Sequence, residues 1–173
     1  MNRTVRNVLG AAFLIAVAAC AFDIAFDMSK DITADGVGTS LSTVQAIDLT
    51  QYKEVQDHKG NITHLQLQSV DATVLTLGTA NGAHTLNGKM SLRASTAPAD
   101  GSQDVLVGQV TNLSVAAGQG FHLAGSAAVD DFLMQQLQGP GTFYVVISGS
   151  ADGEPHLTLR AILHANLGYS AGF

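Results

Sequence analysis

Residues 143–167 read FYVVISGSADGEPHLTLRAILHANL and hold the clearest pattern in the chain. Apolar side chains occupy alternate positions before and after a central polar stretch, which is the period of a half-buried β-strand. A three-residue loop from Ala151 to Gly153 sets Val145 opposite Leu159, whereas a two-residue loop would set it opposite Arg160. The segment therefore predicts an antiparallel β-hairpin with the longer loop, in which the glycine is left-handed.

A second hairpin is predicted around Asn81-Gly82, because both residues tolerate the positive φ angles of a tight two-residue turn. It would pair the β-like run 62–77 with the run 86–92. The apolar positions of the first run change between odd and even numbers, so an unbroken register would set polar against apolar side chains. One extra residue near Val74-Leu75, opposite Gly88, restores the match and predicts a β-bulge.

Shorter patterns extend this picture along the chain. Alternating apolar and polar residues predict further strands at 22–32, 105–115 and 121–123. Two short helices are predicted, at 49–58 after the N-cap Asp48 and at 127–138 after the N-cap Ser126. About eight strands with recurrent turns indicate a mainly β protein, an antiparallel β-sandwich that is Ig-like or similar and carries two short helices. The alternative is a partly closed β-barrel with a helix as its lid.

The first 20 residues differ in character from the rest. Arg3 and Arg6 give a cationic start. Residues 8–17 then form an apolar run that is too short to span a bilayer, since a spanning helix needs about 20 such residues. Small residues lead from there to Cys20, the only cysteine. This order is typical of an export signal, and Val17-Ala18-Ala19-Cys20 resembles the lipobox of bacterial lipoproteins.

The resemblance implies a lipid anchor. In such lipoproteins the lipobox cysteine, here Cys20, receives a diacylglyceryl group on its sulfur, and the chain is cut before it. Residues 1–19 would be a cleaved signal peptide, and residues 20–173 a single mainly β domain in the bacterial cell envelope. Ala21, in place of an aspartate, favours the outer membrane, with the domain facing the periplasm or the surface. An ordinary secretory signal cut near Ala19 and an uncleaved anchor are the alternatives.

The charge balance excludes several classes of partner. Two of the eight basic residues precede Cys20 and all fourteen acidic residues follow it, so the chain from Cys20 onward has six basic residues and a net charge of −8. Such a chain lacks the lysine and arginine clusters that bind nucleic acid or anionic lipid headgroups. Once Cys20 carries lipid, no thiol remains for a disulfide, a metal site or a nucleophile.

Titratable residues form no recognisable site in the sequence. None of the histidines has the spacing of a helical metal site, and two on one strand, His156 and His164, would stand about 26 Å apart. Asp23, Asp27 and Asp31 follow one strand face about 13 Å apart, too far for one calcium ion to bridge. We expect solvated surface positions, with no catalytic residue, no metal ligand and no cofactor. The six histidines are His58, His64, His84, His122, His156 and His164.

These observations predict a non-enzymatic envelope lipoprotein that serves as a scaffold or binding module. Lipid on Cys20 would attach it to a membrane, and surface loops or an open sheet edge would contact an envelope protein or a polymer. The alternative is a carrier of a small apolar ligand or lipid, which needs a core cavity well above about 300 Å³. A hydrolase assembled from distant residues is a third hypothesis. The sequence assigns no ligand-binding residue.

Overall fold

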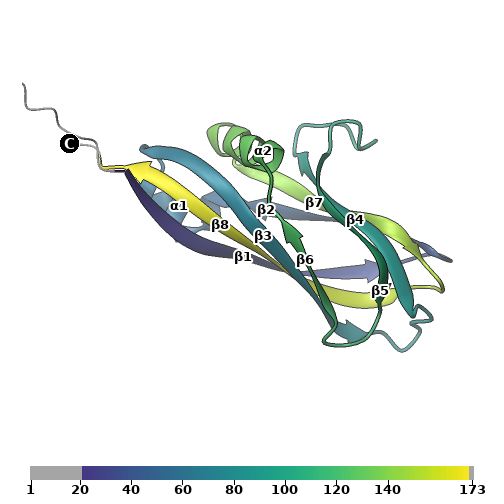
Figure 1. Ribbon diagram of the computed structural model, residues 1–173. Coiled ribbons are helices and arrows are strands. Elements are labelled where there is room, and N and C mark those ends of the chain that lie inside the picture. Colours follow the sequence, from purple (N-terminus) through teal and green to yellow (C-terminus); the bar gives the residue numbers. More distant parts are fainter. Residues whose placement is uncertain (1–20, 172–173) are drawn as a thin grey trace, which may run out of the picture.

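A computed structural model describes residues 21–171, so Cys20 and the predicted signal peptide lie outside the described range. Eight strands and three short helical segments follow one another along the chain (Figure 1). The strands are β1 (Ala21–Asp35), β2 (Ser40–Asp48), β3 (Ile62–Leu77), β4 (Thr85–Ala94), β5 (Val105–Ser114), β6 (Gly120–Ala124), β7 (Thr142–Ala151) and β8 (His156–Ser170). The helical segments are η1 (Leu49–Gln51), α1 (Lys53–His58) and α2 (Ala127–Gln138).

The strands form two four-stranded antiparallel sheets. The first sheet has the order β1-β8-β3-β6 and the second the order β2-β7-β4-β5. The predicted antiparallel sandwich with two short helices is confirmed, and over residues 21–171 the sheets do not close into a barrel. The first strand pairs with the eighth, the second with the seventh, the third with the sixth and the fourth with the fifth. This nested pairing is that of an eight-stranded jelly roll.

Both ends of the described chain lie at one end of the sandwich, which we call the α1 end (Figure 1). Ala21 at the start of β1 pairs with Ser170 at the end of β8. The N–H of Ser170 donates to the carbonyl of Asn61, just after α1, at 2.9 Å. The opposite end, which we call the loop end, carries the connections that follow β1, β3, β5 and β7. These connections are tied together by backbone hydrogen bonds such as Gly36 N–H to Pro155 O at 2.8 Å.

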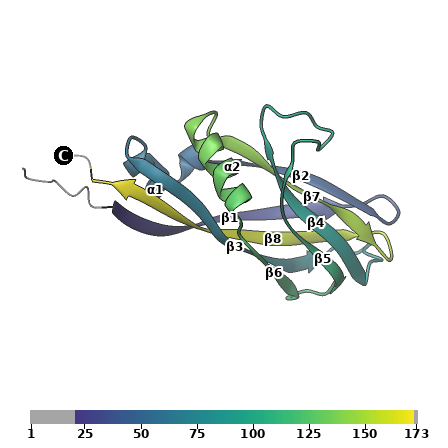
Figure 2. The ribbon, with the colours of Figure 1, turned by 45° about the horizontal axis from the view of Figure 1, so that its top comes forward.

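The core lies between the two sheets and takes alternate residues from the strands. Met28, Leu92, Phe143 and Leu163 are among its fully buried side chains. Helix α2 contacts β3 of the first sheet and β5 and β7 of the second, so it covers one long side of the sandwich (Figure 2). Phe132 of α2 meets Phe143 edge-on, with ring centroids 5.9 Å apart, which is a favoured aromatic geometry.

Both helix starts follow their predicted caps. Ser126 Oγ accepts the N–H of Val129 at the start of α2, and Asp48 Oδ1 accepts the N–H of Thr50 at 2.9 Å. One continuous helix over 49–58 is wrong, because the extended backbone of Tyr52 separates η1 from α1. No helix within residues 21–171 has the length and apolar character needed to cross a membrane.

The two predicted hairpins are wrong in the same way. β7 and β8 belong to different sheets, and so do β3 and β4. The segments between them therefore cross at the loop end from one sheet to the other. Alternating apolar residues show that one face of a strand is buried, but they do not distinguish a hydrogen-bonded neighbour from a strand that faces it across the core.

Polar side chains at the loop end hold these crossings in place. Asn81 Oδ1 accepts the backbone N–H of His156 at 3.1 Å, and Asp152 Oδ1 accepts the backbone N–H of His84 at 2.7 Å. The connection between β3 and β4 is thereby bound to the start of β8, and the connection between β7 and β8 is bound to the residue just before β4. Neither Asn81 nor Gly153 has a positive φ angle, so the two tight turns that the sequence predicts do not form.

The β-bulge predicted near Val74-Leu75 is present, but its partner strand differs. The register of β3 against β8 shifts at Leu75, and one extra residue on β3 is what a bulge requires. The strand opposite is β8 rather than the segment around Gly88. The change of the apolar residues from even to odd positions therefore located the bulge, but it did not identify the strand that pairs with β3 there.

Candidate functional site

Charged and imidazole side chains gather on the outer face of the β1-β8-β3-β6 sheet. Side chains alternate along a strand, so the exposed odd-numbered positions of β1 and the even-numbered positions of β8 share this face. We call this group, whose contacts form four separate rows, the ladder. It consists of Asp23, Asp27, Asp31, Asp35, His64, Asp71, His122, His156, Arg160 and His164.

The register of β1 against β8 places aspartates opposite cationic or imidazole side chains. Asp31 faces Arg160, and Asp35 faces His156. Arg160 donates from Nε and Nη2 to the two oxygens of Asp31 at 2.7 and 2.9 Å, a bidentate geometry. His156 Nδ1 lies 3.1 Å from Asp35 Oδ1. The predicted acidic stripe is therefore an exposed face, as expected, but its carboxylates are paired.

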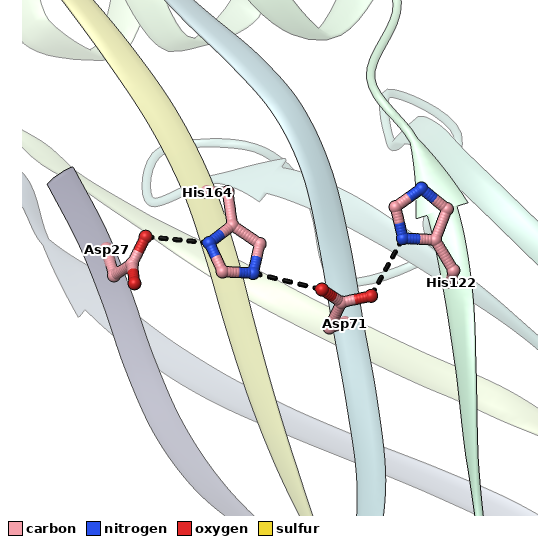
Figure 3. A network of polar contacts seen from close by, with 4 residues as sticks. All are labelled: Asp27, Asp71, His122 and His164. Carbon is pink, nitrogen blue, oxygen red and sulfur yellow. Dashed lines mark hydrogen bonds and ion pairs between the residues drawn. The ribbon is translucent and has the colours of Figure 1, made fainter. Parts of the chain in front are cut away.

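The longest row of the ladder crosses all four strands of the sheet (Figure 3). His164 of β8 lies between Asp27 of β1 and Asp71 of β3, with Nδ1 2.7 Å from Asp27 Oδ1 and Nε2 3.0 Å from Asp71 Oδ2. The other oxygen of Asp71 lies 2.7 Å from Nδ1 of His122 on β6. One carboxylate thus serves two imidazole rings.

This row requires a charged ring at its centre. An ionised carboxylate only accepts hydrogen bonds and a neutral imidazole has a single N–H, so both bonds of His164 form together only in the imidazolium. The hydrogen bond to Asp27 is the main cause that raises the pKa of His164 above its ordinary value. The hydrogen bond from His122 is the main cause that lowers the pKa of Asp71.

A glycine makes room for another row at the α1 end. Asp23 of β1 lies opposite Gly168 of β8, which has no side chain to offer. His64 of β3 lies over this glycine, where a Cβ would overlap its ring, and its Nε2 comes within 3.1 Å of Asp23 Oδ1. The absence of a side chain on Gly168 therefore lets His64 reach across β8 to β1.

The ladder makes the charge of this face depend on pH. Its five carboxylates and one guanidinium carry a formal charge of −4, and Glu154 beside His156 adds a further carboxylate. The charge becomes less negative when His164, whose pKa is raised, takes up a proton. The side chains remain substantially exposed, from 26% for His156 to 66% for Asp35. Exposed ion pairs add little to stability, so the ladder acts mainly on the surface charge.

Other sites are limited within the described chain. Across residues 21–171 no group of three or more His, Cys, Asp or Glu side chains could hold a metal ion. An apolar pocket between the sheets, beside Gly108 and Leu123, has a volume of about 10 Å³, which is room for about one water molecule. A surface cleft of about 470 Å³ lies between α1 and the end of α2, lined in part by Val55, Lys59 and Leu137.

The pairing within the ladder was not predicted from the sequence, although the spacing of its residues was a signal for it. Aspartates recur every four residues from Asp23 to Asp35, and His156, Arg160 and His164 recur at the same interval. Two strands with equal spacing can match row by row, as β1 and β8 do. Cys20, the predicted lipid site, lies outside the described residues.

Comparisons with known proteins give only distant likenesses among solved structures. No family model matches it, and no curated protein matches it. Among solved structures, a decameric BFDV capsid protein has a TM-score of 0.45 at 11% identity, over 86% of this chain and 99% of that one. Desmodium yellow mottle tymovirus gives 0.36 at 13% identity, over 100% and 95%, and turnip yellow mosaic virus gives 0.34 at 11%, over 100% and 91%. Likeness at this level carries no information about function.

Proposed function

We propose that this protein is a non-enzymatic scaffold or binding module of the bacterial cell envelope, attached to the outer membrane by lipid on Cys20. The lipobox-like sequence Val17–Cys20 supports the anchor. Because Ala21 directly follows Cys20 and already belongs to β1, lipid on Cys20 would hold the α1 end against the membrane.

The arrangement of the surface supports a binding role. With the α1 end at the membrane, the loop end is the part of the sandwich furthest from it. β1 is 15 residues long, about 50 Å at 3.3 Å per residue. Val37 in the loop after β1 is 86% exposed and lies within reach of a large partner. An envelope protein or polymer would contact this end or the ladder.

The interior argues against the ligand carrier as the alternative function. A small-molecule site usually encloses at least about 300 Å³, whereas the apolar pocket between the sheets holds about 10 Å³. The side chain of Leu123 fills the space beside Gly108, where a Cβ would come within 2.8 Å of it. A ligand between the sheets would have to displace core side chains, and the cleft of about 470 Å³ beside α1 lies outside that core.

The decisive experiment is mass spectrometry of the protein purified from the envelope of the producing bacterium. The expected product begins at Cys20 and carries the mass of a diacylglyceryl group. A Cys20→Ser variant should fail to incorporate a labelled fatty acid, while the matched Ala21→Ser variant should incorporate it like the natural chain. A mature chain that begins after Cys20, or one that retains residues 1–19 with a free thiol, contradicts the proposal.

The binding role is tested separately by photo-crosslinking in intact envelopes. A photoreactive residue at Val37, at the loop end, should give a reproducible crosslinked product. The same residue at Gln56, exposed on α1 at the other end, should not give that product. No product at Val37 over repeated trials, with the protein still lipidated, contradicts a partner at the loop end.

A further inference from the structure

Three apolar side chains line the inner face of the first sheet at its very tip, beyond the cover of the second sheet. Phe22 of β1 lies opposite Tyr169 of β8, and Tyr169 lies opposite Ile62 of β3. Phe22 belongs to the same alternate row as the buried residues Phe26 and Met28, yet 45% of it is exposed. We call Phe22, Tyr169 and Ile62 the tip row.

Ring stacking supports the tip row from the side of α1. The rings of Phe22 and Tyr169 stack with centroids 5.5 Å apart, and the ring of His58 from α1 stacks on Tyr169 at 3.7 Å. Phenylalanine on the apolar side of a membrane-surface segment is typical of contact with the boundary between headgroups and acyl chains. The exposed ring of Phe22 therefore has a fixed support and an uncovered surface.

The covalent chain limits how far this ring can be from lipid on Cys20. Only Ala21 separates Phe22 from Cys20, and two residues span at most about 7 Å between their Cα atoms. We propose that the tip row contacts the phospholipid bilayer that holds the lipid of Cys20, with Phe22 in the headgroup region. This inference rests on the lipid anchor proposed above.

The charges of the α1 end favour an apolar contact over an electrostatic one. Lys53 is paired with Asp57, and Asp23 meets His64 at 3.1 Å. Lys59 adds one exposed cation and Glu54 one carboxylate, so this end lacks the basic cluster that binds anionic lipid. The contact should therefore be insensitive to salt and to the fraction of anionic lipid, and it would fix the orientation of the domain as a second attachment beside the acyl chains.

The absence of tryptophan from the chain allows a direct test. A Phe22→Trp variant, purified in its lipidated form and reconstituted in phosphatidylcholine vesicles, has a single tryptophan as its probe. Lipids brominated near the top of the acyl chains should reduce its emission by about half or more, because interfacial side chains reach about 5–10 Å into the boundary. The matched Val37→Trp variant at the loop end should lose less than about a tenth, because the 15 residues of β1 place this end about 50 Å from the tip row.

Each outcome has a distinct meaning. Quenching of Phe22→Trp that is unchanged by anionic lipid and by salt supports the proposal. An unquenched Phe22→Trp in vesicle-bound protein, with lipid on Cys20 verified by mass spectrometry and a folded circular dichroism spectrum, overturns the tip contact and leaves the anchor intact. Equal quenching of Phe22→Trp and Val37→Trp would contradict an orientation in which the α1 end faces the bilayer and the loop end points away from it. An unlipidated Cys20 in the natural chain overturns the anchor and the tip contact together.

Discussion

The two outer faces of the sandwich have opposite characters. The outer face of the β1-β8-β3-β6 sheet carries the ladder, whose charge becomes less negative when His164 takes up a proton. In β2 and β7 of the other sheet the outward positions are small hydroxyl and aliphatic side chains, such as Ser42, Val44, Val146 and Ser148, while β4 adds Lys89 and an Arg93 that is paired with Asp104. Both sheets share one apolar core. Stability should therefore depend on the inner faces, and the response to pH on one outer face.

The largest expected effect comes from the inner face beneath the ladder. Leu163 is fully buried on β8, next to His164. Leu163→Ala should lower the free energy of unfolding by about 2–5 kcal/mol, because it removes apolar contacts and leaves a cavity. Denaturant unfolding would measure this loss at several pH values, and it should be similar at each. The control, Val44→Ala at an exposed site on the other sheet, should change the value by less than about 0.5 kcal/mol.

Substitutions at two glycines, one in each sheet, compare how the two sheets tolerate an added side chain. A Cβ on Gly149 of β7 would overlap the carbonyl oxygen of Asn87, a backbone atom of the neighbouring strand, whereas a Cβ on Gly168 of β8 would overlap only the ring of His64. Gly149→Ala should cost about 1–3 kcal/mol, since overpacked backbone cannot move freely. Gly168→Ala should cost less than about 1 kcal/mol, because an exposed side chain can swing away.

Thermal or denaturant unfolding would measure which of the two glycine variants loses more free energy of unfolding. The NMR chemical shifts of the His64 ring in Gly168→Ala would show whether this ring has left Asp23. Equal losses of stability in the two variants would contradict the distinction between a backbone and a side-chain obstacle.

The smallest expected effect is a pH dependence that resides in the ladder. The pKa of His164 is raised in the folded protein, so its contribution to stability is present below about pH 6.5, the ordinary value, and is lost as the pH rises through the raised pKa. The pKa of Asp71 is lowered, so its contribution is present above the ordinary value of 3.8 and is lost as the pH falls through the lowered pKa.

A His164→Gln variant tests this window. The difference in free energy of unfolding between the natural chain and His164→Gln should be largest near pH 5 to 6, between about the two ordinary pKa values, and should shrink at alkaline pH. His84→Gln, outside the ladder, is the control and should follow the pH profile of the natural chain. A His164→Gln profile parallel to that of the natural chain at all pH values would remove the ladder as the source of the pH response.

Local features of the fold could be predicted from the sequence, and pairings could not. The caps Asp48 and Ser126 and the bulge at Leu75 depend on neighbours within a few residues. The sheet partners of β3 and β7 depend on how the chain crosses the loop end, where Asn81 and Asp152 bind backbone far away in sequence. A hairpin within one sheet and a connection between two sheets give the same alternation of apolar residues. The alternation therefore does not show which of the two connections forms.

The candidate site shows the same division between local and distant information. The four-residue spacing of the aspartates was visible, but Asp31 and Arg160 lie 129 residues apart. Their contact follows from the pairing of the first and last strands, which one sequence did not reveal. The gap that Gly168 leaves for His64 needed three strands in register to be recognised.

The pairing of β1 with β8 has a mechanical consequence. All 15 residues of β1 are matched with β8. A force applied between the N-terminus and the loop end acts along the length of β1, so the hydrogen bonds of the pair are loaded together in shear. A force between the two chain ends, which leave from the pair Ala21 and Ser170, would separate the same strands one bond at a time. The jelly roll should therefore resist tension from a membrane attachment far better than it resists peeling from its own termini.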